Sequence, residues 1–104
     1  MVSAGWSGAV VDGQGRRLEL KRLGVLERLR LFEAAGAELS RNDRWLGMAV
    51  LAASVTAMDG VPLPFPASKA AVEAAVQRLG EQGIAAVAGA LAPEPAFDQA
   101  SAGN

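Results

Sequence analysis

The stretch AVVDGQGRRLELK, residues 9–21, joins a β-prone run, a turn signal and a run of alternating polarity. Residues 12–15 read DGQG and favour a tight turn, because glycine accepts positive φ and aspartate bonds its own backbone. In the alternating run, Leu18 and Leu20 share one face and charged side chains take the other. The stretch therefore predicts a β-hairpin over 9–21. Because a lone hairpin is only marginally stable, it must pack on helices or pair with another chain.

Four helices are predicted after the hairpin, separated by glycines and by a proline-rich segment. They span about 25–35, 43–58, 69–79 and 81–91. Gly36 and Gly80 are predicted to end the first and third helices, since glycine suits the left-handed position after a helix. Ser68 is predicted to cap the third helix through its hydroxyl.

The first predicted helix has one clear apolar face. At 100° per residue, Val25, Leu29 and Phe32 share that face. Leu31 lies off it, so we expect Leu31 to be available to a partner.

The second predicted helix is apolar almost all round. Trp45 to Met58 carries no charge over 14 residues, and only Ser54 and Thr56 are polar. A helix that is apolar on every side must be covered on every side, either by the other helices or by another subunit. The run is shorter than the roughly 20 residues needed to span a bilayer, so no membrane span is expected.

Residues 61–66 read VPLPFP, and their alternating prolines force an extended segment. Leu63 and Phe65 are expected either to dock on the domain's own core or to act as a recognition strap. Together these elements predict the α+β class: a small N-terminal hairpin, then a bundle of about four helices. We expect one domain over 1–92 and a flexible, disordered tail over 93–104.

Composition excludes several functional classes. The 104 residues include no cysteine and no histidine, which removes disulfides, thiolate sites and the commonest general base and metal ligand. We therefore expect no enzyme activity, no catalytic residues, no cofactor and no metal. The net charge of −1 does not suggest nucleic-acid binding. The first 11 residues lack a positively charged n-region, so we expect no signal peptide and a cytoplasmic location.

The order of apolar, glycine and proline positions over residues 12–91 resembles the tail assembly chaperones of tailed phages and prophages. The segments that carry the resemblance are DGQGR (12–16) with Leu18, GVL (24–26) with LRLF (29–32), WLGMA (45–49), MDGVPLP (58–64), and VE (72–73) with RLGEQGIAAV (78–87).

The resemblance implies a non-enzymatic interaction protein of the host cytoplasm. Such chaperones bind the apolar helices of the tape-measure protein and help to recruit tail tube subunits around it. It implies no catalytic residues, and we expect a homo-oligomer. Our candidate contact residues are Leu31, Trp45, Met48, Leu51 and Phe65, and the alternative for each of them is packing in the chain's own core. The alternatives are a structural virion component, such as a head–tail connector or minor tail protein, and a small regulatory or nucleic-acid-binding module.

Overall fold

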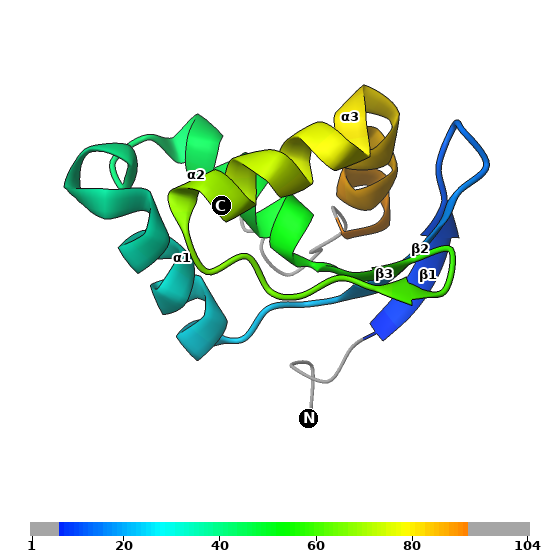
Figure 1. Ribbon diagram of the computed structural model, residues 1–104, viewed down its shortest axis with the longest axis horizontal. Coiled ribbons are helices and arrows are strands. Elements are labelled where there is room, and N and C mark those ends of the chain that lie inside the picture. Colours follow the sequence, from blue (N-terminus) through cyan, green and yellow to red (C-terminus); the bar gives the residue numbers. More distant parts are fainter. Residues whose placement is uncertain (1–6, 92–104) are drawn as a thin grey trace, which may run out of the picture.

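A four-stranded antiparallel sheet joins two hairpins that lie far apart in the sequence (Figure 1). The computed structural model describes residues 7–91. The strands are β1 (Ser7–Val11), β2 (Arg17–Lys21), β3 (Val55–Met58) and β4 (Val61–Pro62), in the order β1-β2-β3-β4. The predicted N-terminal hairpin is confirmed, and its first strand begins at Ser7 rather than at Ala9.

The second hairpin, β3–β4, was not predicted. Its turn is Asp59-Gly60, and both residues have positive φ, 51° and 83°, as a two-residue hairpin turn of type I′ requires. Asp59 also ties this turn to β2, because its Oδ1 accepts from the Arg17 N–H at 2.8 Å and its own N–H donates to the Arg17 carbonyl.

Three helices accompany the sheet: α1 (Val25–Leu39), α2 (Asp43–Ala53) and α3 (Lys69–Leu91). The α+β class is confirmed, but the expected number of about four helices is wrong. The predicted helices 69–79 and 81–91 form the single element α3, interrupted at Gly80 with φ 66° and ψ −175°. Gly36 interrupts α1 in the same way, with φ 84° and ψ 174°. Side chains with a Cβ rarely adopt this backbone region, which explains glycine at both breaks.

The predicted helix 43–58 is wrong beyond Ala53. Asn42 caps α2, accepting from the Trp45 N–H at 3.0 Å, and the helix ends at Ser54. Residues 55–58 then form β3, a central strand that pairs with both β2 and β4. The run is apolar because α2 packs against its neighbouring helices through Ala49, Ala52 and Ala53, and β3 is a central strand; Met48 of the same run stays 41% exposed. Val55 and Thr56 are β-branched, which suits a strand.

The core consists of two clusters. The first lies between the sheet, α2 and α3, and its buried members are Leu18, Leu20, Ala52, Val55, Leu79, Val87 and Leu91. The second lies between α1, α2 and the first half of α3, and its buried members are Leu23, Leu31, Ala49, Ala53 and Val72. Val76, which is half-buried on α3, packs against both clusters. The two clusters are thus joined through α2 and α3.

The proline-rich segment docks on this core. Leu63 continues the pairing of β4, since its N–H donates to the Thr56 carbonyl at 2.9 Å. Leu63 packs against the first cluster and Phe65 against the second, and Pro66 is buried. Of the two expectations for Leu63 and Phe65, docking on the domain's own core is confirmed. The predicted tail, residues 93–104, lies outside the described residues.

Candidate functional site

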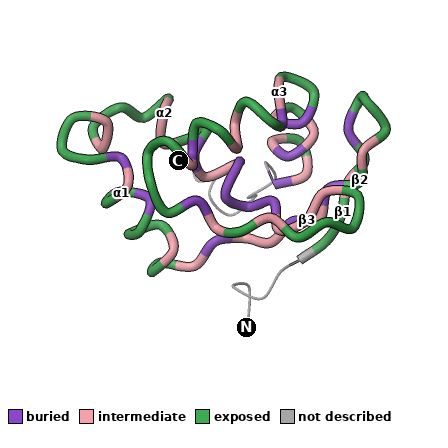
Figure 2. Tube along the Cα trace, viewed as in Figure 1, coloured by how far each residue is buried: buried purple, intermediate pink, exposed green. Residues whose placement is uncertain are grey.

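The most exposed apolar surface of the described chain lies on α1, at the left of Figure 1. Four large side chains there remain in solvent: Val25 at 78% exposure, Leu26 at 60%, Leu29 at 52% and Phe32 at 45%. We call these four side chains the α1 apolar face. Figure 2 shows the same helix exposed along much of its length. A soluble domain rarely leaves so many large apolar side chains together in solvent unless they meet a partner.

The sheet positions the start of α1. Glu27 accepts from the Gly24 N–H at 2.8 Å and pairs with Lys21 at the end of β2. These bonds fix where the helix begins and how it leaves the sheet. The charged side chains of Arg28, Arg30 and Glu33 are exposed along the same helix. The α1 apolar face is therefore bordered by charges of both signs.

A shallow hollow lies where α1 is interrupted. It has a volume of about 470 Å³, and Phe32, Glu33, Gly36, Ala37 and Ser40 line it. Phe32 belongs to both features, so the hollow extends the α1 apolar face toward the end of the helix. Because the hollow is shallow, it adds contact area beside the α1 apolar face rather than an enclosed pocket.

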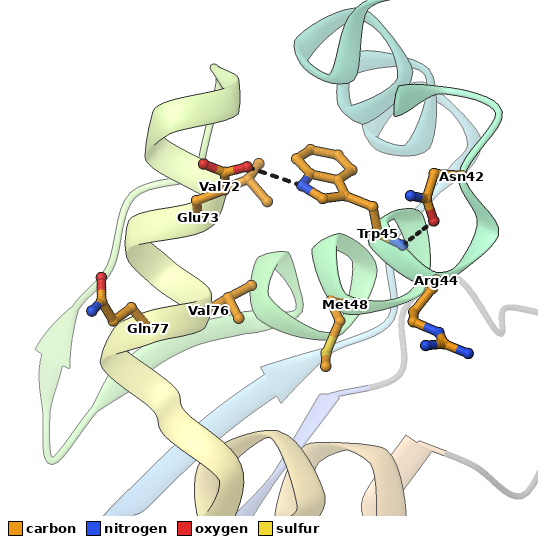
Figure 3. A pocket seen from close by; sticks show the side chains of 8 residues that line it. All are labelled: Asn42, Arg44, Trp45, Met48, Val72, Glu73, Val76 and Gln77. Atoms are coloured by element: carbon orange, nitrogen blue, oxygen red, sulfur yellow. Dashed lines mark hydrogen bonds between the residues drawn. The ribbon is translucent and has the colours of Figure 1, made fainter. Parts of the chain in front are cut away.

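A second hollow, of about 380 Å³, lies between α2 and α3 (Figure 3). We call it the Trp45 hollow, and its lining residues are Asn42, Arg44, Trp45, Met48, Val72, Glu73, Val76 and Gln77. The Trp45 indole reaches across from α2, and its Nε1 donates to the Glu73 carboxylate at 3.2 Å. Met48 is 41% exposed one turn further along α2, whereas Arg44 points away from α3.

The five candidate contact residues fall in different places. Trp45 and Met48 come together in the Trp45 hollow. Leu51 is half-buried against the first core cluster. Phe65 is half-buried and lines a third hollow, of about 240 Å³, between the proline segment and α3. Leu31 is 1% exposed and belongs to the core, so the expectation that it would face a partner is wrong.

The error at Leu31 has a physical reason. The α1 sequence carries two apolar stripes, and the helix turns the smaller one, Leu31 with Ala35, toward α2. Alanines on the facing helix, Ala49 and Ala53, allow the two backbones to approach closely around Leu31. The larger stripe, which is the α1 apolar face, then remains exposed to solvent. The sequence signal for this arrangement is the second stripe itself, Leu31 with Ala35.

Chemical groups for catalysis or metal binding are sparse. Within residues 7–91, no three acidic side chains come close enough to hold a metal ion. None of the three helices in that range is long and apolar enough to cross a membrane. The polar feature that stands out is a buried ion pair in the β1–β2 turn, between Asp12 and Arg16.

The Asp12 side chain is completely buried, and both of its carboxylate oxygens accept hydrogen bonds. Its Oδ1 accepts from the N–H groups of Gln14 and Arg16, and its Oδ2 accepts from the Arg16 guanidinium at 2.8 Å. Burial opposes ionisation, but these hydrogen bonds outweigh it and lower the pKa of Asp12. A hydrogen bond from Lys21 and one from the Gly24 N–H likewise lower the pKa of Glu27.

Acid is expected to destabilise the fold through these two carboxyls. Because their pKa values are lower in the folded chain than in the unfolded chain, the unfolded chain binds protons first as the pH falls. Their stabilising contribution is complete above the unfolded pKa values, near 4. It is lost as the pH falls through the folded values. Urea unfolding between about pH 7 and pH 2.5 should show a midpoint that stays level and then drops below about pH 4.

Glu27→Gln should show a smaller drop in the urea midpoint, because this variant has no carboxyl to protonate at that position. Glu33→Gln removes an exposed carboxylate from the same helix and controls for the change in net charge. Equal acid sensitivity in wild type and Glu27→Gln would contradict the role assigned to Glu27.

The described residues thus form two candidate surfaces: the α1 apolar face and the Trp45 hollow. Neither carries a nucleophile paired with a base. The α1 apolar face consists of large apolar side chains, whereas the Trp45 hollow combines apolar side chains with polar and charged ones. Comparison of this chain with family models, with curated proteins and with solved structures found no match.

Proposed function

We propose that this protein is a non-enzymatic tail assembly chaperone of a tailed phage or prophage, which uses the α1 apolar face to hold apolar helices of the tape-measure protein. The observation that carries the proposal is the exposure of Val25, Leu26, Leu29 and Phe32 on one helix. The sequence resemblance over residues 12–91 supplies the biological setting: the bacterial host cytoplasm, with tail tube subunits as further partners.

The chemistry of the α1 apolar face suits a helical client. An amphipathic helix presents apolar side chains at a spacing that matches another helix, and it buries them by lying along it. Each large side chain covered contributes on the order of 1 kcal/mol, part of which offsets the entropy of association. The resulting affinity is modest. Reversible holding of a client that must later be released calls for such an affinity.

The Trp45 hollow offers a second contact of adaptable shape. Met48 is unbranched and exposed, and such side chains repack readily around different partners. Trp45 presents a large apolar ring whose N–H already bonds Glu73, so covering the ring leaves no unpaired donor. Both features favour recognition of apolar helices by shape and burial rather than by one specific sequence.

Peptide binding tests the proposal directly. Labelled peptides tiling the tape-measure protein of a tailed phage would be titrated with the purified protein. Peptides that form an apolar helical face should bind, and peptides of the same composition with a scrambled period should not. Replacing Leu29 and Phe32 together with arginine should weaken binding by about 100-fold or more, since two contacts are lost and two charges are buried.

Val11→Arg is the matched control, because Val11 is also exposed, at 61%, but lies on β1 far from α1. It should bind peptides as the wild type does. Unchanged binding by the Leu29/Phe32 variant would overturn the assignment of the α1 apolar face. Stable incorporation of the chain into purified tail particles would favour a structural virion component instead, and steeply salt-dependent DNA binding would favour a nucleic-acid module.

A further inference from the structure

The two edges of the sheet differ in whether they can accept another strand. β4 is two residues long, contains Pro62 and is followed by Pro64. Proline has no N–H to donate, so this edge is blocked. β1 reads SGAVV, without charge or proline, and pairs with β2 over five residues without a bulge. Among the described strands, β1 therefore provides the one long edge without the usual protection against pairing.

The hydrogen bonds of β2 determine which groups of β1 point outward. Arg17 and Lys21 of β2 bond toward β3, to Asp59 and to the Ser54 carbonyl. Directions alternate along a strand, so Leu18 and Leu20 bond toward β1, where their partners are Val10 and Gly8. It follows that the backbone N–H and C=O groups of Ser7, Ala9 and Val11 point away from β2, toward the open edge.

We propose that two copies of this chain pair β1 against β1, antiparallel, about a two-fold axis at Ala9. The outward groups are symmetric about that residue: Ser7 meets Val11 of the second copy, and Ala9 meets Ala9. Each of these three pairs exchanges two hydrogen bonds, about six in all. The result is one continuous sheet of eight strands. This inference does not rest on the proposed function.

The pairing closes after two copies. A two-fold contact uses the same edge in both subunits, so it leaves no further β1 edge free. The remaining edges of the joined sheet are the two proline-blocked β4 strands. A second copy is therefore a better occupant than an open chain of subunits. Figure 1 places α1 at the other end of the long axis from β1, so both α1 apolar faces remain accessible in the pair.

Side chains and charges permit the contact. Ala9 is small, and Val11, which is 61% exposed, gains cover from the second copy. Glu19 lies opposite Ala9, so the two copies' Glu19 residues are three strand spacings apart, about 14 Å. That separation exceeds the Debye length at physiological salt, and the repulsion is largely screened. An interface of one short strand is small, which points to a dissociation constant in the micromolar range.

Ala9→Lys tests dimerisation separately from folding. Within one chain the new ammonium group faces Glu19 across the hairpin, a favourable cross-strand pair. Between two chains, two ammonium groups meet directly. Ala57→Lys is the matched control, since Ala57 also lies opposite Glu19 but on the central strand β3. Ala9→Pro is a second variant, and it removes an outward N–H without breaking a β1–β2 bond.

Sedimentation equilibrium of the full chain would be measured over roughly 1 µM to 1 mM. The wild type and Ala57→Lys should dimerise. Ala9→Lys should raise the dissociation constant by about tenfold or more, and Ala9→Pro should do the same. Mixing Ala9→Lys with Ala9→Glu should restore a mixed dimer, because opposite charges then meet. Circular dichroism melts confirm that each variant is folded.

Three results would overturn the proposal. One is a wild type that stays monomeric over the whole range. A second is self-association that Ala9→Lys leaves unchanged. The third is a dimer that survives Ala9→Lys but is lost when Leu29 and Phe32 are replaced with arginine, which would assign the interface to the α1 apolar face.

Discussion

Replacing Arg16 with methionine is expected to lower the free energy of unfolding by about 3 kcal/mol and the melting temperature by more than about 10 °C. The Arg16 guanidinium donates to the carbonyls of Arg78 at 3.1 Å and Leu79 at 2.8 Å. These carbonyls end the first helical segment of α3, just before the interruption at Gly80. Without Arg16 they lose a charged donor, at a helix end where few other donors are available.

Arg17→Met provides the matched control for this prediction. Arg17 is the next residue, and its side chain is 62% exposed with only a 4.0 Å surface contact to Glu19. Its loss should change stability by less than about 0.5 kcal/mol. Arg16→Lys should fall between the two, because one ammonium cannot match the fork of donors that a guanidinium offers. Equal urea midpoints for Arg16→Met and Arg17→Met would show that the contacts to Arg78 and Leu79 contribute nothing.

The Arg16 contacts illustrate which parts of the fold the sequence could predict. The DGQG turn and the glycine break at position 80 were both read correctly from local chemistry, because each depends on residues adjacent in sequence. The contact between the DGQG turn and the break at position 80 was not predictable. Gly13 lies against the Gln82 side chain, and Gly83 against Leu79 and Arg16. These approaches depend on how α3 crosses the hairpin, and hydrophobic periodicity carries no information about that.

The prediction of one helix over residues 43–58 was wrong for a different reason. A buried helix and a buried strand both appear as uninterrupted apolar sequence, so periodicity alone cannot separate them. The local signal for a change was present in Ser54, Val55 and Thr56, where a helix-ending residue precedes two β-branched residues. What fixes the outcome is the pairing with β2, in which Leu20 lies opposite Val55. That partner lies more than 30 residues earlier in the chain.

The candidate site was partly predictable. Trp45 and Met48 stand out by residue type, and the structure brings them together in the Trp45 hollow. The exposure of the α1 apolar face was not predicted, because the residue of this helix expected to meet a partner was Leu31, which lies off the face shared by Val25, Leu29 and Phe32. An amphipathic pattern shows that a helix has an apolar face, but it does not show whether that face meets the chain's own core or a partner.

Leu31→Ala should lower the free energy of unfolding by about 3 kcal/mol, whereas Leu29→Ala should change it by less than about 1 kcal/mol. Leu31 is 1% exposed among Leu23, Ala49, Ala53 and Val72, so its removal leaves a cavity with small neighbours that cannot fill it. Leu29 is 52% exposed, and alanine favours the helix slightly more than leucine does. Urea unfolding of both variants at neutral pH measures the difference.

The same pair of variants separates stability from binding. Leu29→Ala should keep the fold and weaken the capture of apolar helical peptides, because it removes one side chain of the α1 apolar face. Leu31→Ala should weaken the fold, yet its remaining folded molecules should bind peptides as the wild type does, since Leu31 is buried in the core. The reverse ranking in either measurement would mean that α1 packs with its bulky stripe inward. The helix would then have no apolar face left to offer a client.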